Sequence, residues 1–378
     1  MKNASFVTEK HKNTIALAVI LFVNCVFAIK YAERYTDWYM LVAAFSVIVQ
    51  LLLFAKRNVI FEKLQKIKHS SFFILVICSA IFLFLASQVP LESLRVNRWS
   101  VITSFWDCYF NNLYVYKAKA FDGIYPGAMP FYFVLMFPFY LLREFSYVTV
   151  IAVFGLYFLL KTEKQKGVYM LLIVSSITFL YEVLTRSTIF FNSVLIVASL
   201  YYFFNTKTNI FFKGIVIGLL LSTRNVYVFV YGIAFIYALR NSVYSFRNLL
   251  TMGVVALLTF AATFIPFVIN HSTEFSEANP FLMETSAFMP PLLTFLCVII
   301  SLLFAFFAKN KSDIFFLSGV TLFLTIVSYF AYHIIINGFH TAFWGSVADV
   351  TYFIFCVPFF LYFLIENGSK LPKQSVTH

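Results

Sequence analysis

The residues best suited to chemistry lie in one polar segment of the chain. Asp107 and Asp122 are carboxylates within Val89–Ala128, and Asn97 precedes them in the same segment. A carboxylate can take a proton from a hydroxyl group, whereas an amide cannot do so at neutral pH. The segment therefore offers general-base chemistry toward a hydroxyl-bearing substrate, with Asp107 and Asp122 as candidate bases.

Cations accompany these acids. They are Arg95, Arg98, Lys117 and Lys119 in the segment, and Arg186 and Arg224 beside later apolar runs. Guanidinium groups bind phosphate bidentately, and ionisable groups in apolar surroundings are costly enough to suggest function. These cations could together hold the phosphate of an anionic lipid. The alternatives are nonspecific pairing with headgroups, snorkelling at a helix end or, for Arg186, an i,i+4 ion pair with Glu182.

Other kinds of site have little support. His271 and His340 have no Asp or Glu at ligand spacing, so we expect no cofactor and leave open only a divalent cation. No phosphate loop, dinucleotide fingerprint or Ser-His-Asp spacing occurs. The cysteines show no CxxC spacing, so we interpret them as small core residues; they are Cys25, Cys78, Cys108, Cys297 and Cys356.

Composition identifies the elements that must position these residues. The 378 residues are 61% hydrophobic and 12% charged, with a mean hydropathy of +0.86. Soluble domains are about 45–50% apolar and about 25% charged. The fold class is therefore an all-α polytopic integral membrane protein, with residues 1–378 as one membrane domain. The net charge of +12 lies mostly in short gaps between apolar runs, which argues against nucleic acid as a partner.

Apolar runs of about 20 residues mark the expected spans. They are Thr14–Lys30, Asp37–Ala55, Ser70–Gln88, Val168–Val183, Ser187–Phe204, Leu249–Asn270, Met289–Ala308, Ile314–Asn337 and Val347–Ile365. Met129–Leu160 is one broken span or two short ones, split at Arg143-Glu144. Gly214–Leu239 is one span or a short hairpin, split at Thr223-Arg224-Asn225.

The short segments between apolar runs that are rich in Lys and Arg decide how many times these two stretches cross the membrane, because cytoplasmic loops are rich in Lys and Arg. Counting Met129–Leu160 as one crossing and Gly214–Leu239 as a hairpin predicts about 12 transmembrane helices, with both termini and the polar tail 371–378 in the cytoplasm. Val89–Ala128 is then an external loop. A thirteenth crossing would put basic gaps on the wrong side.

The external loop is expected to contain a surface helix, because aromatic and aliphatic residues recur in it at three- and four-residue spacing. These residues are Trp99, Ile102, Phe105, Trp106, Tyr109 and Phe110. Such a helix should lie flat on the membrane with its apolar side down and Asn97 as its N-cap. Tyr125-Pro126-Gly127 and Pro130 then predict a rigid turn into the next helix.

Two segments resemble the glycosyltransferase-C superfamily of membrane enzymes. Asn97-Arg98-Trp99-Ser100, Tyr116, Gly123, Tyr125-Pro126, Pro130 and the apolar run through Pro138 resemble that superfamily's first external loop. Gly214-x-x-x-Gly218 with Arg224 resembles its short hairpin with a cation at the external end. The resemblance covers roughly Arg95–Leu142 and Gly214–Leu239.

The resemblance implies transfer of a hexosyl or pentosyl group from a polyprenyl-phosphate sugar donor to an acceptor at the external membrane face. The residues it assigns to substrate binding are Arg95, Arg98, Trp99, Lys117, Lys119, Tyr125, Arg186 and Arg224. Asn97 stands where these enzymes carry their acid. Asp107 is then the first substitute and Asp122 the second; otherwise the alignment is shifted or catalysis has been lost.

Two other functions fit the same sequence. One is a multi-span transporter or flippase of a lipid-linked or anionic substrate, although no inverted repeat is visible in the sequence. The other is a non-catalytic glycosyltransferase-like scaffold. Membrane lipids are partners in every case. The composition is typical of a bacterial cytoplasmic (inner) membrane protein, and it leaves the oligomeric state open.

Overall fold

Helices make up 78% of the computed structural model, and its described residues contain no strand, so the all-α prediction is confirmed. The structure describes residues 8–64, 66–94, 96–287 and 289–368.

The first elements are α1 (Glu9–Ala32), α2 (Tyr39–Ala55), α3 (Arg57–Leu64), α4 (Ser70–Ser87), η1 (Leu91–Ser93), α5 (Arg98–Phe110), η2 (Val115–Lys117), α6 (Pro130–Leu142), α7 (Ser146–Leu159), α8 (Glu163–Val174), α9 (Ile177–Leu184) and α10 (Ile189–Asn205). The remaining elements are α11 (Ile210–Leu221), η3 (Asn225–Tyr227), α12 (Val228–Arg240), α13 (Phe246–Ala262), α14 (Ile265–Val268), α15 (Ser272–Glu277), α16 (Pro280–Ala287), α17 (Pro291–Phe304), η4 (Ala305–Phe307), α18 (Lys311–Asn337), α19 (Phe339–Phe343), η5 (Val350–Cys356) and α20 (Val357–Gly368).

Five helical segments among the described residues are long and apolar enough to cross a membrane, or up to seven if each of two bent pairs is one span. They identify the chain as an integral membrane protein. Several other apolar helices have only 10–17 residues. The count of twelve crossings therefore stays a prediction.

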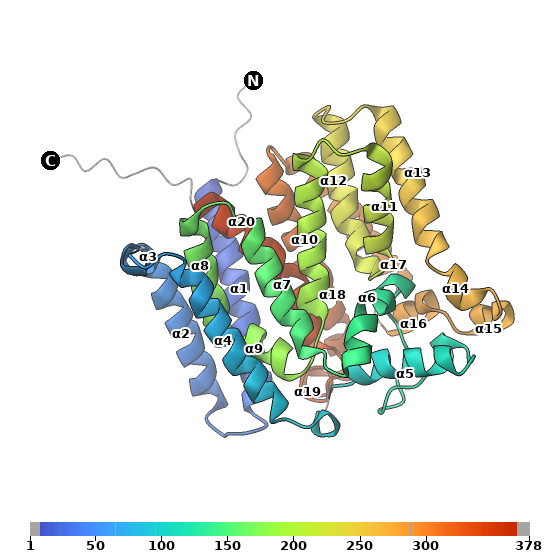
Figure 1. Cartoon of the computed structure of the whole chain (residues 1–378), viewed down its shortest axis with the longest axis horizontal. Helices are drawn as coiled ribbons and strands as arrows, with labels where there is room; N and C mark the ends of the chain where they lie inside the picture. Colours follow the sequence, from blue (N-terminus) through green and yellow to red (C-terminus); the bar gives the residue numbers. More distant parts are fainter. Residues whose placement is uncertain (1–7, 65, 95, 288, 369–378) are drawn as a thin grey trace.

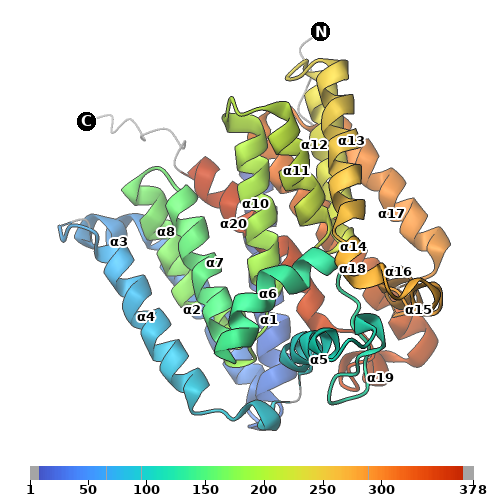
Figure 2. The same ribbon diagram turned by 45° about the vertical axis from the view of Figure 1, so that its right-hand side comes forward.

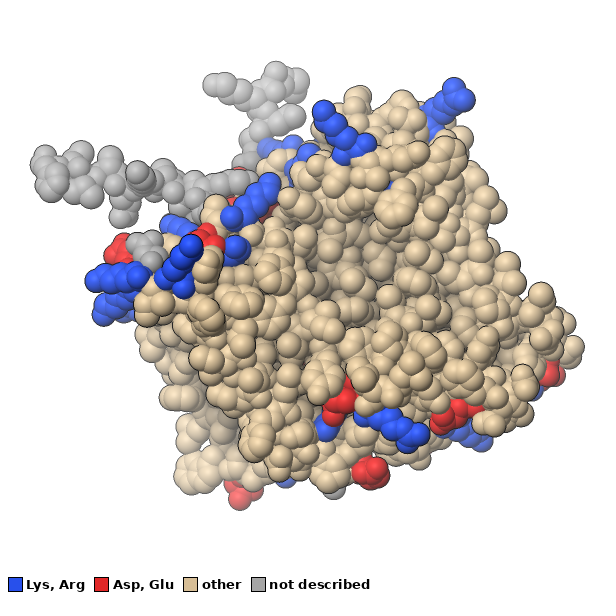
Figure 3. All heavy atoms as spheres, viewed as in Figure 1, with Lys and Arg blue, Asp and Glu red and all other residues tan. Residues whose placement is uncertain are grey.

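The bundle has two chemically different ends (Figures 1 and 3). We call the end where α1 begins and α3 lies the basic face, because Lys and Arg gather along it. At the opposite end α5 lies across the bundle, near α19, and we call this end the α5 face (Figure 2). Acidic and basic side chains mix there, and the surface seen between the two ends is almost free of charge (Figure 3). This pattern is typical of a protein with an apolar belt between two aqueous ends.

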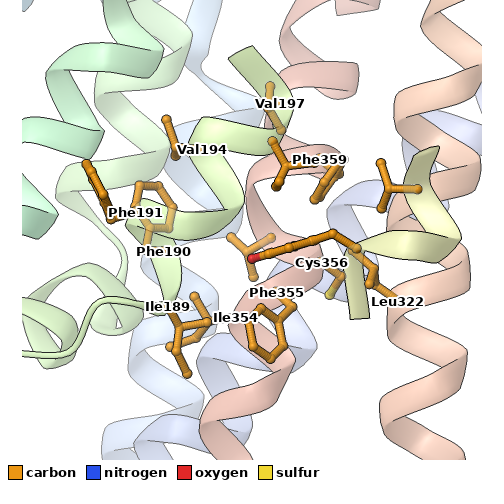
Figure 4. Packing of buried hydrophobic residues seen from close by; sticks show 14 of the residues in the cluster. Ile189, Phe190, Phe191, Val194, Val197, Leu322, Ile354, Phe355, Cys356 and Phe359 are labelled. Carbon is orange, nitrogen blue, oxygen red and sulfur yellow. The ribbon is translucent and has the colours of Figure 1, made fainter. Parts of the chain in front are cut away.

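The core lies where α10 packs against η5 and α20. Figure 4 shows apolar side chains of these elements facing one another, with Ile189 beside Ile354 and Val197 near Phe359. Ile189, Ile354 and Phe359 are fully buried. The last apolar run of the sequence is therefore an interior element rather than a lipid-facing one.

The run Val168–Val183 is bent instead of straight, which corrects the expectation of a single regular span. Its two parts, α8 and α9, meet at 67°. Asn24 of α1 holds the break, because its Oδ1 accepts hydrogen bonds from Ser176 Oγ at 2.9 Å and from Thr178 N at 3.2 Å. Asn24 Nδ2 donates to Gln50 of α2 at 3.1 Å. Backbone groups freed at a break inside a membrane protein need such partners.

The break in Met129–Leu160 occurs at the predicted position. Arg143 ends α6 in the left-handed conformation, with φ of 54°, and α7 begins at Ser146. The start of α6 is inside the molecule, where Met129 N and Tyr132 N donate to the carbonyl oxygens of Thr223 and Ser222 at 3.3 and 3.1 Å. The α6 helix is therefore a short helix whose buried start is attached to the link between α11 and α12.

The surface helix α5 exists, but protein covers the middle of its apolar side and leaves only Tyr109 and Phe110 at its end exposed among the six apolar residues named above, which corrects the expectation that the whole side faces lipid. Ile102 and Phe105 are fully buried and Trp106 is 6% exposed. The Phe105 ring stacks on Phe133 of α6 at 3.6 Å between centroids, and also contacts Phe267 of α14. Packing against α6 removes these rings from the membrane surface.

The hairpin α11–α12 also breaks where the sequence predicts, and two glycines hold it against α13. A Cβ added at Gly214 would meet Val255 Cβ at 2.8 Å. A Cβ at Gly218 would meet Thr259 Cβ at 2.8 Å and would lie still closer to the Ala256 carbonyl oxygen. Small residues at this spacing allow two membrane helices to approach closely.

Gly218→Ala should therefore lower stability by about 1–3 kcal/mol, because the added methyl group overpacks a tight contact. Thermal unfolding of the purified chain in lipid nanodiscs measures the effect. Gly253→Ala on α13 is the matched control, because a Cβ there meets nothing within 4 Å. An equal response of the two variants would show that the glycine contact does not hold the hairpin.

Candidate functional site

Asn97 and Asp122 form a direct contact at the α5 face. Asn97 Nδ2 donates to Asp122 Oδ2 at 2.8 Å, although the side chain of Asn97 was expected to cap α5 and makes no cap hydrogen bond. The Trp99 ring stacks on Phe121 at 6.1 Å between centroids, which fixes the loop against α5. Asp122 therefore places a carboxylate beside Asn97.

Asp107 lies elsewhere. It is nine residues beyond Arg98 on α5, and at 1.5 Å rise per residue this is about 14 Å along the helix axis. Asp107 Oδ1 accepts a hydrogen bond from the Tyr140 hydroxyl at 2.8 Å near the end of α6. The two candidate bases are thus separate, and only Asp122 contacts Asn97.

Arg98 points into the protein, where it pairs with Asp349. Its guanidinium donates to Asp349 Oδ2 at 2.6 Å and also to the Thr351 hydroxyl. Asp349 caps η5, as expected for an acid opening that run, by accepting a hydrogen bond from Thr351 N at 2.9 Å. Burial alone would lower the pKa of Arg98, but Asp349 and the other acidic groups around it together raise that pKa, so the side chain stays cationic. This pair joins α5 to the last apolar run.

Arg186 does not pair with Glu182, so the expected i,i+4 pair is wrong. Helix α9 ends at Leu184, and Arg186 lies beyond it in the left-handed conformation, with φ of 53°. The Arg186 guanidinium instead donates to the carbonyl oxygens of Ala86 and Val89 at 2.6 and 2.9 Å and lies 3.4 Å from Glu144. Arg186 therefore fixes the end of α4.

Glu182 is fully buried and belongs to a different group of residues. Its Oε2 accepts a hydrogen bond from Phe190 N at 2.9 Å, at the start of α10. Tyr132 of α6 lies in electrostatic range of Glu182, Arg98 and Arg224, and its hydroxyl bonds to Thr188 Oγ1 at 2.8 Å. We call Arg98, Tyr132, Glu182, Thr188 and Arg224 the polar cluster.

Arg224 is the cation of this cluster that has no acidic partner among the residues that the structure describes. It is half-buried in the link between α11 and α12, and its guanidinium carbon lies 5.3 Å from the centroid of the Tyr132 ring. Among the described residues it forms no ion pair, and its Nε has no hydrogen-bond partner. A half-buried guanidinium in this state can bind an anion.

The other expected ligands lie apart from the polar cluster. Lys117 pairs with Glu277 at 2.7 Å on the surface, and that contact raises the pKa of Lys117. Lys119 lies over the Tyr125 ring at 5.6 Å. Arg95 and the tail 371–378 lie outside the described residues. Of the predicted cations in the described residues, Arg224 therefore contacts Tyr132, and Arg98 lies in electrostatic range of the same tyrosine.

Sequence reasoning missed Tyr132, Thr188 and Asn192. Tyr132 lies in an aromatic run that carries no functional signal. Thr188 and Asn192 are four residues apart at the start of the apolar run Ser187–Phe204, so they share one helix face. This pair of polar residues at helical spacing within an apolar run is the sequence feature that could have predicted their role.

No group of three His, Cys, Asp or Glu residues in the described part of the chain could hold a metal ion. His271 lies 3.5 Å from Glu274 in α15, so the expectation that no acid stands at ligand spacing from this histidine is wrong. The five cysteines are free. Comparison with protein-family models, curated proteins and solved structures finds no match to this chain.

Proposed function

We propose that this protein is a membrane glycosyltransferase that moves a sugar from a polyprenyl-phosphate donor to a hydroxyl-bearing acceptor at the α5 face. The observation that carries the proposal is the half-buried Arg224 guanidinium, which has no ion pair among the described residues and lies over Tyr132. A lipid phosphate would supply the missing anion, and its hydrocarbon chain would remain in the apolar belt.

The contact between the two segments that carry the family resemblance also supports the proposal. The start of α6 belongs to the first segment and the 222–224 link to the second. Phe131 N donates to Ser222 Oγ at 3.3 Å, and two further backbone bonds join the same turns. Segments that are remote in the sequence thus meet where Arg224 lies.

The proposed chemistry uses one carboxylate and one anion-binding group. Asp122 takes the proton of the acceptor hydroxyl, whose oxygen attacks the anomeric carbon of the sugar. The bond from that carbon to the phosphate oxygen breaks, and polyprenyl phosphate leaves. Arg224 stabilises the charge that develops on the phosphate. Arg186 and Lys117 are left out of the donor site, because their own partners hold them elsewhere.

The proposal includes a topology. Twelve crossings, counting α11 and α12 as a hairpin, put both termini in the cytoplasm and the α5 face outside. The concentration of Lys and Arg at the basic face supports this orientation (Figure 3). We propose a bacterial cytoplasmic membrane as the location.

A transfer assay tests the proposal. The full chain in proteoliposomes is incubated with radiolabelled polyprenyl-phosphoryl hexoses and pentoses and a bacterial envelope extract as the acceptor source. We expect label to move into acceptor material, and Arg224→Gln to lower that rate at least about tenfold through the lost charge. Label that crosses the bilayer still attached to its lipid would instead indicate a flippase. Binding of the donor without any reaction would indicate a scaffold.

A further inference from the structure

Asn192 is a buried amide with no hydrogen-bond partner on its side chain. It lies in the first turn of α10 and is 1% exposed. Neither its Oδ1 nor its Nδ2 has a partner among the described residues. A buried polar group without a partner is rare in native proteins, because its desolvation is uncompensated.

The helix geometry directs Asn192 toward the polar cluster. Thr188, one turn earlier, bonds to Tyr132 of α6 at 2.8 Å, and Ser193 bonds to Tyr227 of η3 at 2.9 Å. Viewed along the axis of α10, the side chain of Asn192 points between those of Thr188 and Ser193. Arg224 lies in the same place, over Tyr132 and three residues before Tyr227. The amide therefore faces the junction of α6 with the α11–α12 link.

Other polar atoms around this junction also lack partners in the described structure. They are Arg98 Nε, Arg224 Nε and Glu182 Oε1, the last of which lies beside the Ser187 hydroxyl without a well-formed hydrogen bond. Arginine can only donate, an ionised carboxylate can only accept, and an amide does both. Unsatisfied donors and acceptors from separate elements thus occur both in the polar cluster and at Asn192, which faces it.

The presence of both unsatisfied donors and unsatisfied acceptors distinguishes between a phosphate and a sugar as the ligand. Phosphate oxygens accept hydrogen bonds from arginine, but they offer no donor to Glu182 Oε1 or to Asn192 Oδ1. Hydroxyl groups donate and accept, so a ring bearing several of them could satisfy the whole set. We propose that Asn192, with Glu182 and Arg98, forms an inner subsite that binds the sugar ring of the donor while Arg224 binds its phosphate. This inference rests on the proposed function.

A comparison of ligands with and without the sugar tests the subsite. The full chain in lipid nanodiscs is titrated with farnesyl phosphate and with a panel of farnesyl-phosphoryl hexoses and pentoses. We expect at least one sugar-bearing ligand to bind about tenfold more tightly than farnesyl phosphate, the gain of one or two good hydrogen bonds. Asn192→Leu should remove this gain and leave the affinity for farnesyl phosphate within about twofold.

The same variant separates ligand binding from a structural role. Leucine keeps the branching and the number of side-chain heavy atoms of asparagine and leaves no unpaired amide, so thermal stability without ligand should stay equal or rise. Asn205→Leu, at the opposite end of α10, is the control and should keep the full gain. The subsite would be overturned if Asn192→Leu still bound the sugar-bearing ligand more tightly than farnesyl phosphate, or if the wild type bound all ligands equally. The hydrogen-bond partner of the Asn192 amide would then be an ordered water molecule. Absence of farnesyl phosphate binding would instead overturn the proposed function, and the subsite with it.

Discussion

Asp122→Asn should lower the rate of sugar transfer by about 100- to 10,000-fold, the usual contribution of a general base. The substitution keeps the size of the side chain and its contact with Asn97 while removing the ability to take a proton. Transfer of radiolabel in proteoliposomes measures the loss. Affinity for farnesyl phosphate should stay within about twofold, because Arg224 is unchanged.

Two further variants make this result specific. Asp107→Asn should change the rate less than about threefold, since Asp107 lies about 14 Å along α5 from Arg98 and binds Tyr140. The double variant Asn97→Asp/Asp122→Asn exchanges the two side chains of the contact, so that the carboxylate stands at position 97. It should recover much of the lost activity. A large loss in Asp107→Asn with none in Asp122→Asn would reverse the assignment.

Arg98→Met should lower stability by as much as any other substitution considered. It leaves Asp349 without its cation, and removing one partner of a fully buried pair costs about 3–5 kcal/mol. The Asp349 side chain is 38% exposed, so solvent screening reduces the expected loss to about 1–3 kcal/mol. Thermal unfolding in nanodiscs measures it. Asp349→Asn in the Arg98→Met background should restore part of the stability by removing the unpaired charge.

The surface ion pair Lys117–Glu277 is the control for the stability loss expected from Arg98→Met. Its side chains are 46% and 60% exposed, and such pairs contribute little to stability. Lys117→Met should therefore leave the unfolding temperature unchanged within error. Equal losses for Lys117→Met and Arg98→Met would show that the Arg98–Asp349 contact does not hold α5 to the last apolar run.

Hydropathy and turn-forming residues predicted much of the helix order. The breaks at Arg143-Glu144 and at Thr223-Arg224-Asn225 are local events, and charged or polar residues within apolar runs indicated both. The bend between α8 and α9 could not be predicted in this way. It depends on Asn24 and Gln50, which reach the break from helices more than 100 residues away in the sequence.

The site was less predictable than the fold, because its contacts join distant segments. Asn97 and Asp122 are separated by 25 residues, and no periodicity relates them. Arg98 was expected to bind a ligand, but its partner Asp349 lies 251 residues away. The expected pair of Glu182 and Arg186 failed for a local reason, since α9 ends between them and helical spacing no longer applies. Spacing predicts neighbours only while the helix continues.

Ligand binding to Arg224 tests the central claim, that a lipid phosphate binds beside Tyr132. Farnesyl phosphate and farnesol differ only in the phosphate, so their affinities for the full chain in nanodiscs isolate its contribution. The wild type should bind farnesyl phosphate at least about tenfold more tightly than farnesol, and Arg224→Gln should abolish the difference. Arg247→Gln, an exposed arginine at the start of α13, should preserve it. Equal affinities for both ligands in the wild type, or an undiminished difference in Arg224→Gln, would contradict the account.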